Sequence, residues 1–217
     1  ATLVNAVDEG RSIYDNIRKF IRYLLACNIG EVMTMFVGML MGMPVILLPI
    51  QILLINLVTD GLPAIALGLE PASKNAMSRP PRKPNEGVFS NGLATKIVIR
   101  GLLIGLSTLA SFVTLFKLSH DLDIARSGAL FALIFAQLIH VFECKSETKN
   151  LLHIHYTNNI KLILATSLSL IVLLVVLYCP PIAVIFSTVP LTLSQVIVPI
   201  GYCFIAPIAN IILHPDK

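Results

Sequence analysis

The stretch "NLVTDGLPAIALG", residues 56–68, decides how this chain folds. It lies inside a run, residues 47–69, that is apolar enough to cross a bilayer, yet it holds the carboxylate of Asp60. Gly61 and Pro63, two residues that weaken a helix, follow directly. A charged side chain at the centre of a bilayer costs at least about 2.5–3.5 kcal/mol on insertion scales. The stretch therefore indicates a membrane helix that is irregular beside a functional carboxylate.

The composition places the chain among integral membrane proteins. Of its 217 residues 56% are hydrophobic and 13% are charged, and the mean hydropathy is +0.84. This apolar excess is spread over many segments. The chain starts with mixed polar residues and without Met, so we expect no cleavable signal peptide and a longer parent polypeptide. The net charge of +4 predicts no nucleic-acid partner, because in a membrane protein the distribution of charge matters more than the sum.

Apolar runs of about 20 residues, the length that spans a bilayer, predict an all-α polytopic membrane protein with six transmembrane helices. The runs cover residues 23–41, 47–69, 94–116, 127–143, 160–178 and 194–213. Lys and Arg gather before the first run, between the second and third, and between the fourth and fifth, while the other side has only Lys117 and Arg126. Both termini are therefore predicted to be cytoplasmic.

Two segments outside the spans have distinct patterns. Residues 8–22 mix charged residues with apolar ones at spacings of three and four, which predicts an amphipathic stalk helix that continues into the first span. Residues 70–93 are too rich in proline for a helix and predict an extended cytoplasmic loop. This loop is either a solvated linker or a docking site for a cytoplasmic domain. The cysteines have no metal-binding spacing and are predicted to be buried apolar residues: Cys27, Cys144, Cys179 and Cys203.

Polar side chains recur at similar depth in the first two spans. Asn28 and Glu31 are three residues apart, and Asn56 and Asp60 are four apart with Thr59 adjacent, so each pair is predicted to share a helix face. No Lys or Arg lies at that depth in these spans, so protonation or a bound cation must neutralise the carboxylates. Oxygen ligands of this kind suit hard cations such as Ca²⁺. The alternative is a pair of protonated carboxyls that only hold the helices together.

The helix break completes this prediction. Gly61 and Pro63 are expected to let the backbone unwind near residues 60–63, where it lines a cavity enclosed by protein, and so to turn the neighbouring oxygens toward one ion. In the fourth span, His140 lies three residues after Gln137 and shares its face. It is expected to make an interhelical hydrogen bond, with Gln137 within reach.

Three motifs carry a resemblance to a known family. "EGRSIYDNIRKFIRYLLACNIGE" (residues 9–31), "QILLINLVTDGLPAIALGLEP" (51–71) and "RPPR" (79–82) closely resemble the P-type calcium ATPases, and the similarity covers the last six membrane helices of those pumps. It implies that residues 1–22 are the end of the phosphorylation domain and the stalk, and 23–69 the ion-binding helix pair. Residues 70–93 are then a coupling loop with Arg79 and Arg82, and 94–217 a four-helix support region.

The resemblance also implies the ligands and what this chain lacks. The metal ligands it implies are Asn28, Glu31, Asn56, Thr59 and Asp60. Gln137, a neutral amide, stands where pumps with two sites have an acid, so it is a remnant of a second site. The phosphorylation motif, and with it the sites for ATP and Mg²⁺, is absent from these 217 residues. The implied partners are the first four helices and the cytoplasmic domains of the same pump, and the lipid bilayer.

The function implied is export of Ca²⁺, with one Ca²⁺ per ATP and a counter-transported proton carried by Glu31. The alternatives are a pump for manganese or another cation and, from a different class, a fragment of an ion channel or antiporter. A channel would present its filter residues from symmetric subunits, whereas these ligands lie on the first two of six helices. The expected location is a bacterial plasma membrane.

Overall fold

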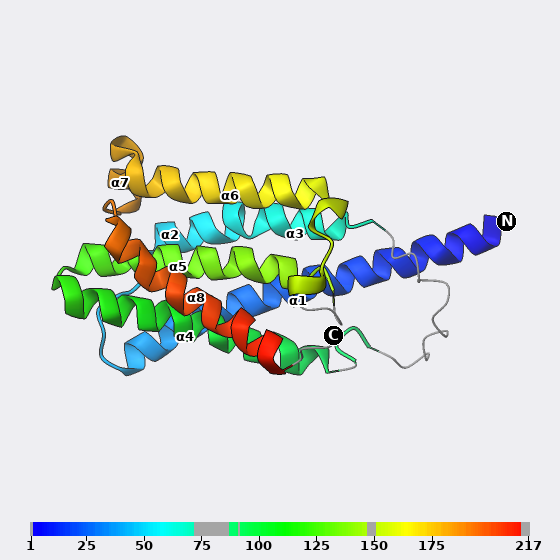
Figure 1. Cartoon of the computed structure of the whole chain (residues 1–217), viewed down its shortest axis with the longest axis horizontal. Coiled ribbons are helices and arrows are strands. Elements are labelled where there is room, and N and C mark those ends of the chain that lie inside the picture. Colours follow the sequence, from blue (N-terminus) through cyan, green and yellow to red (C-terminus); the bar gives the residue numbers. More distant parts are fainter. Residues whose placement is uncertain (1, 72–86, 91, 147–150, 214–217) are drawn as a thin grey trace.

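The computed structural model describes residues 2–71, 87–90, 92–146 and 151–213, and Figure 1 traces them. The described residues form helices and contain no strand, which confirms the all-α prediction. Arg79 and Arg82, the predicted coupling residues, lie outside the described residues. The first described helix begins, and the last one ends, toward the same end of the helix bundle in Figure 1.

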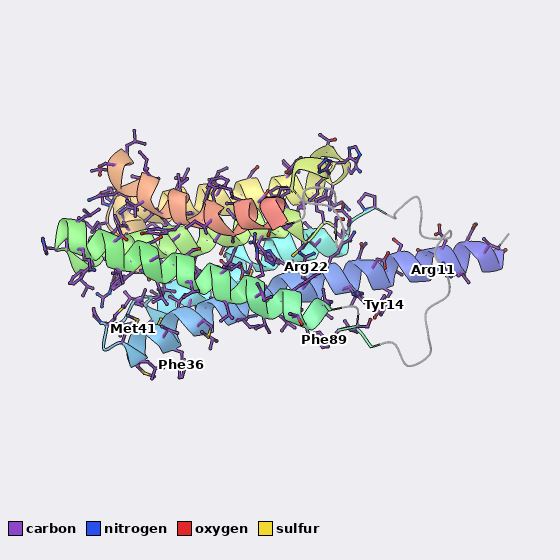
Figure 2. The ribbon with its side chains drawn as sticks, turned by 60° about the horizontal axis from the view of Figure 1, so that its bottom comes forward. Arg11, Tyr14, Arg22, Phe36, Met41 and Phe89 are labelled. Atoms are coloured by element: carbon purple, nitrogen blue, oxygen red, sulfur yellow. The ribbon has the colours of Figure 1, made fainter. Side chains whose placement is uncertain are left out.

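The first helix, α1 (Thr2–Leu40), is continuous over 39 residues and so about 58 Å long at 1.5 Å per residue. The predicted stalk and the first span are therefore one helix. Its N-terminal half extends beyond the other helices in Figure 1, and Figure 2 places Arg11 and Tyr14 on that extension and Arg22 where the bundle begins. The apolar stalk residues Ile13 and Ile17 are exposed in this chain.

The second span consists of three consecutive segments: α2 (Pro49–Leu54), the π-helical turn η1 (Ile55–Thr59) and α3 (Gly61–Gly68). The amide of Asp60 donates to the carbonyl of Ile55, five residues back, at 2.8 Å, which is the hydrogen bond of a π-helix. The irregular backbone thus precedes the predicted position at residues 60–63 and is a widened turn, not an unwound segment. Pro63 needs no amide hydrogen there, because it lies in the first turn of α3.

The rest of the chain adds α4 (Leu93–Ser119), α5 (Leu122–Glu143), α6 (Ile160–Tyr178), α7 (Pro180–Phe186) and α8 (Leu193–Leu213), with short 3₁₀ turns η2 (Leu151–His153) and η3 (Tyr156–Asn158). Among the described residues, five helical segments are long and apolar enough to cross a membrane: α1, the second span, α4, α5 and α6. With the 21-residue α8 they account for the six predicted spans. The structure is a polytopic membrane domain, as predicted.

Helix α5 is the centre of the bundle. It lies between α4 and α6 in Figure 1, it also contacts α1, α3 and α8, and its side chains Leu130, Leu133 and Ile134 are fully buried. Beyond its first turns, where Asp123 is exposed, α5 is covered on all sides, so its later polar side chains, such as Gln137 and His140, are buried in the protein. Three of the four cysteines are buried as predicted; the exception is Cys179, which is half-buried just before α7.

Helices α1 and α4 pack with their backbones in close contact. A Cβ atom added to Gly101 would lie 2.9 Å from the carbonyl oxygen of Ala26, and one added to Gly105 would lie 2.9 Å from that of Gly30. Glycines spaced by four on a membrane helix permit such an approach. This contact fixes the part of α1 that carries Glu31.

We expect Gly101→Ala to destabilise the protein by about 1–3 kcal/mol, because the added methyl overpacks the contact with α1. Thermal unfolding of the purified protein in detergent measures the change. Gly10→Ala is the matched control, because the added methyl would have no neighbour within 4 Å beyond the adjacent residues and the backbone of its own helix, and Ala favours a helix more than Gly does. Equal midpoints for the two variants would contradict the close contact.

The C-terminal end of α3 is tied to three other parts of the bundle. The Asn16 amide, from α1, donates to the carbonyl oxygen of Glu70 at 2.7 Å. The Asn159 amide, just before α6, donates to the carbonyl of Ala66 at 2.9 Å and to the Glu70 carboxylate at 2.7 Å. Lys145, two residues after α5 ends, pairs with the same carboxylate at 3.3 Å. These bonds satisfy carbonyls that the helix end leaves without an intrahelical partner, and they fix the second span at this end.

Candidate cation-binding site

Two carboxylates from different spans meet inside the bundle. Glu31, on α1, is 5% exposed and Asp60, after the π-helical turn, is 1% exposed. The side-chain amide of Gln137, on α5, donates to both, at 3.1 Å to Glu31 Oε1 and 3.2 Å to Asp60 Oδ2. The sequence predicted that the polar residues of the first two spans lie together. The structure adds a third helix, α5, whose Gln137 joins the two acids.

The π-helical turn explains how Thr59 and Asp60 both face inward. Neighbouring residues on an α-helix project about 100° apart, and the wider turn changes this angle locally. Both side chains are almost completely buried. The Thr59 hydroxyl donates to the Ile55 carbonyl of its own turn at 3.1 Å. Thr59 thus lies beside the carboxylate with its hydroxyl bonded within the helix.

The two predicted asparagine ligands have different positions. The Asn56 amide donates to Glu31 Oε2 at 2.8 Å, so Asn56 joins the carboxylates although its side chain is exposed. Asn28 is also exposed, and its amide donates to the carbonyl of Leu24 in its own helix at 2.9 Å. The structure brings Glu31, Asn56 and Asp60 together and leaves Asn28 on the exposed side of α1.

Tyr23 is a member of the site that the sequence analysis missed. Its side chain is fully buried and its hydroxyl donates to Asp60 Oδ1 at 3.1 Å. The residue spacing could have predicted this position. Tyr23, Cys27 and Glu31 are spaced by four residues, so they share one face of α1 and Tyr23 faces the same way as Glu31. With Tyr23 and Gln137, each oxygen of Asp60 accepts a hydrogen bond.

All the donors that contact the two carboxylates in the described hydrogen bonds are neutral: the Tyr23 hydroxyl and the Asn56 and Gln137 amides. None of the described ion pairs involves Glu31 or Asp60. The Gln137 side-chain oxygen is buried without a protein partner. The described residues contain no cluster of three His, Cys, Asp or Glu side chains placed to hold a metal. The site thus offers carboxylate, amide and hydroxyl oxygens, the ligands that hard cations prefer.

A second buried polar cluster lies next to this site and was not predicted. Arg100, on α4, forms an ion pair with Glu143, on α5, and His140 Nδ1 lies 3.2 Å from Arg100 Nε. The interhelical contact expected of His140 is confirmed, but its partner is Arg100. Arg100 was predictable as an arginine inside an apolar run, whereas the approach of Glu143 depends on how α4 and α5 pack.

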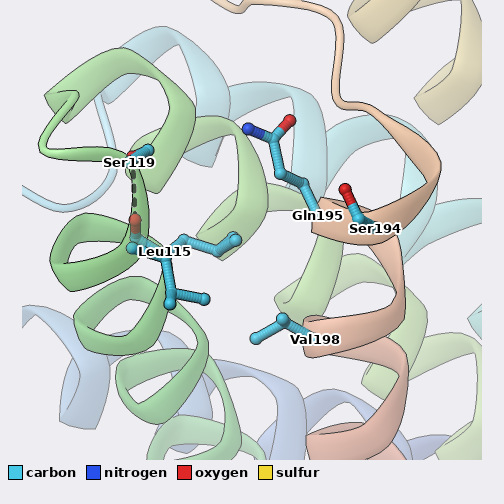
Figure 3. Close-up of a pocket in the computed structure, with 6 residues that line it drawn as sticks. Leu115, Ser119, Ser194, Gln195 and Val198 are labelled. Atoms are coloured by element: carbon cyan, nitrogen blue, oxygen red, sulfur yellow. Dashed lines mark hydrogen bonds between the residues drawn. The ribbon is translucent and has the colours of Figure 1, made fainter.

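The carboxylates lie apart from the two described pockets. One, of about 230 Å³, lies between α4 and α8 and is lined by residues that include Leu115, Ser119 and Gln195 (Figure 3). The other, of about 320 Å³, lies between α5 and α6 and includes Phe135 and Tyr156. No residue of the candidate site lines either pocket. The site is centred on buried side chains, with Asn56 at its exposed edge, and it does not coincide with either pocket.

Comparison with known families matches the sequence to one of them. Residues 44–214 match the family described as "Cation transporting ATPase, C-terminus". The chain belongs to this family. The match includes the second span with Asp60 and the helix that carries Gln137, so two of the three helices that meet at the carboxylates belong to the cation ATPase C-terminal region.

Two relatives extend the similarity to α1. The chain is 48% identical over 202 residues to a "Calcium-transporting ATPase" of Bacillus subtilis (strain 168), covering 93% of this chain and 23% of that protein. It is 37% identical over 211 residues to "Calcium-transporting ATPase 1" of Bacillus cereus (strain ATCC 10987 / NRS 248), covering 90% of this chain and 24% of that protein. This cation ATPase C-terminal region thus spans about a quarter of the length of the curated relatives it matches.

Proposed function

We propose that this chain is the C-terminal membrane region of an ATP-driven calcium pump and supplies oxygen ligands for Ca²⁺ inside the bilayer. The observation that carries the proposal is the buried pair Glu31 and Asp60, bridged by Gln137 and contacted only by neutral donors in the described hydrogen bonds. Two acids that share a low-dielectric site repel each other unless protons or a cation neutralise them. A divalent cation matches their combined charge. Both relatives are named as calcium-transporting ATPases.

The ligands proposed for Ca²⁺ are Asn28, Glu31, Asn56, Thr59 and Asp60. Ca²⁺ takes six to eight oxygens, so the carboxylates alone are too few. Asn28 and Asn56 lie on the exposed side of the site. Exposed apolar side chains on the same two spans, such as Val32 and Leu57, suit a surface that other membrane helices of the pump cover. Those helices would supply the remaining ligands, and Asn28 would turn toward the ion.

We propose a separate role for each of four consecutive segments of the chain. Residues 1–22 connect to the phosphorylation domain, 23–69 carry the ion site, 70–93 couple the domains, and 94–217 support the site. ATP and Mg²⁺ would be bound by the preceding part of the same polypeptide. The pump would lie in a bacterial plasma membrane with both chain ends in the cytoplasm, and two observations support this: the distribution of Lys and Arg, and relatives from two Bacillus species.

Asp60→Asn in the full-length pump should abolish calcium-dependent phosphorylation by ATP. The amide keeps the shape of the side chain but lacks the charge that a divalent ion needs. Phosphoenzyme formation from radioactive ATP, measured as a function of free Ca²⁺, tests this expectation.

The matched control for Asp60→Asn is Leu62→Ala, two residues along, which removes a half-buried apolar side chain and should leave the calcium dependence close to that of the wild type. Wild-type calcium affinity in Asp60→Asn would refute the site. Repeating the assay with Mn²⁺ and Na⁺ distinguishes a calcium pump from pumps for those cations. An intact protein that forms no phosphoenzyme would favour a channel or antiporter.

We expect one Ca²⁺ per ATP, because Gln137 contributes no charge where an acid would support a second ion, and ligand charge governs affinity. Glu31 would then carry a counter-transported proton. Equilibrium binding of radioactive calcium to the full-length pump, divided by the phosphoenzyme level, should give a ratio of about one. A ratio of about two would contradict this, and Gln137→Glu then tests whether an added acid raises the ratio.

The coupling role of residues 70–93 predicts a different phenotype. Reversing the charge at Arg79 and Arg82 should slow turnover and leave equilibrium calcium binding nearly unchanged, because the loop would connect domains without contacting the ion. Turnover and calcium binding are measured on the same preparation. Equal losses in both would show that these arginines do not act by coupling alone.

A further inference from the structure

The buried cluster next to the cation site has no role in the proposed ligand set. Arg100 and Glu143 form an ion pair between α4 and α5. His140 Nδ1 lies 3.0 Å from Glu143 Oε2 and 3.2 Å from Arg100 Nε, and its Nε2 lies 3.4 Å from the Cys144 sulfur. Polar groups on both edges of the imidazole therefore fix the orientation of the ring.

This ring contacts the site through Tyr23. The ring centroids of His140 and Tyr23 are 6.2 Å apart with an interplanar angle of 32°, and both side chains are fully buried. The Tyr23 hydroxyl in turn donates to Asp60 Oδ1 at 3.1 Å. A continuous series of contacts thus leads from the ion pair to His140, to Tyr23 and to the carboxylate.

The hydrogen bond from Tyr23 to Asp60 keeps its geometry only while the Tyr23 ring is confined by its neighbours. A hydrogen bond to a charged carboxylate depends strongly on distance and angle. Close-packed neighbours restrict a buried ring, and loss of one neighbour gives it room to move. His140 packs against the ring of Tyr23, whereas the hydroxyl reaches Asp60.

The buried ion pair between Arg100 and Glu143 can hold His140 firmly in place against Tyr23. Breaking it would leave a charge uncompensated inside the protein, so the pair keeps its geometry. Because Arg100 and Glu143 come from different helices, the pair also fixes α4 against α5 at the level of His140. The support is therefore rigid where it touches Tyr23.

We propose that His140, held by Arg100 and Glu143, is a positioning residue that keeps the Tyr23 hydroxyl on Asp60 and so sets calcium affinity from outside the ligand set. This inference rests on the proposed function, since it assigns an affinity-setting role to side chains that do not touch the ion. A cluster that only stabilises the fold would change unfolding without changing affinity.

The test compares His140→Ala, His140→Phe and Tyr23→Phe in the full-length pump. His140→Ala should raise the Ca²⁺ concentration for half-maximal phosphorylation about three- to tenfold, the usual coupling between contacting residues, without a comparable loss of maximal phosphoenzyme. His140→Phe keeps a ring against Tyr23 and should restore the concentration to within about twofold of the wild type. Tyr23→Phe should match His140→Ala, and the double variant Tyr23→Phe, His140→Ala should be no worse than Tyr23→Phe alone, because both act through one hydrogen bond.

Two further variants make the test decisive. Glu143→Gln breaks the ion pair with little change of shape and should raise the half-maximal concentration in the same direction, even where His140→Ala fails to fold. Leu130→Ala, ten residues away on the same buried helix, should lower the unfolding temperature and leave the calcium dependence unchanged. An unchanged calcium dependence in both cluster variants, or effects of Tyr23→Phe and His140→Ala that multiply, would overturn the inference. A wild-type pump without calcium-dependent phosphoenzyme would instead overturn the proposed function.

Discussion

Two almost completely buried carboxylates, Glu31 and Asp60, are the constraint on which the rest of this structure depends. The charge of a carboxylate is poorly stabilised in a low-dielectric interior, and two of them add mutual repulsion. Glu31 and Asp60 receive hydrogen bonds from side chains on three helices. Each of these helices must be held at the right distance, and that requirement explains the close α1–α4 contact, the ties at the end of α3 and the central position of α5.

The neutral donors hold the carboxylates without replacing a cation. An amide or a hydroxyl stabilises a carboxylate through a dipole, and only a counter-ion or a proton removes the net charge. These hydrogen bonds therefore orient the two acids, and a proton or the proposed cation would still be needed to neutralise their charge. Such an orientation would lower the entropic cost of binding the proposed cation, because fewer side chains would have to become ordered.

Much of this fold could be predicted from the sequence, because the length of apolar runs and the positions of acids within them are local properties. The six spans, the continuous stalk and the pairing of Glu31 with Asn56 and Asp60 follow from residue spacing. The unwound backbone predicted near residues 60–63 was wrong, since Gly61 and Pro63 show that a helix is weak but not which backbone geometry replaces it or where; the structure has a π-helical turn at Ile55–Thr59.

The residues that the sequence did not place depend on contacts between distant helices. Tyr23 and Gln137 donate to Asp60 from helices 37 and 77 residues away along the chain, and no local pattern shows which donor reaches which oxygen. The same holds for Asn28. Its spacing from Glu31 is right for a shared face, but its position depends on what covers that face, and in this chain nothing described does.

The uninterrupted form of α1 has a mechanical consequence. Its 39 residues pack against α4 over several turns, from Ala26 beside Gly101 to Gly38 beside Leu109. Asn16 also ties the stalk to the end of α3. No break in the helix separates the stalk from Glu31, so a displacement of the protruding end would be passed along one rigid rod to the carboxylate, and α4 would have to move with it.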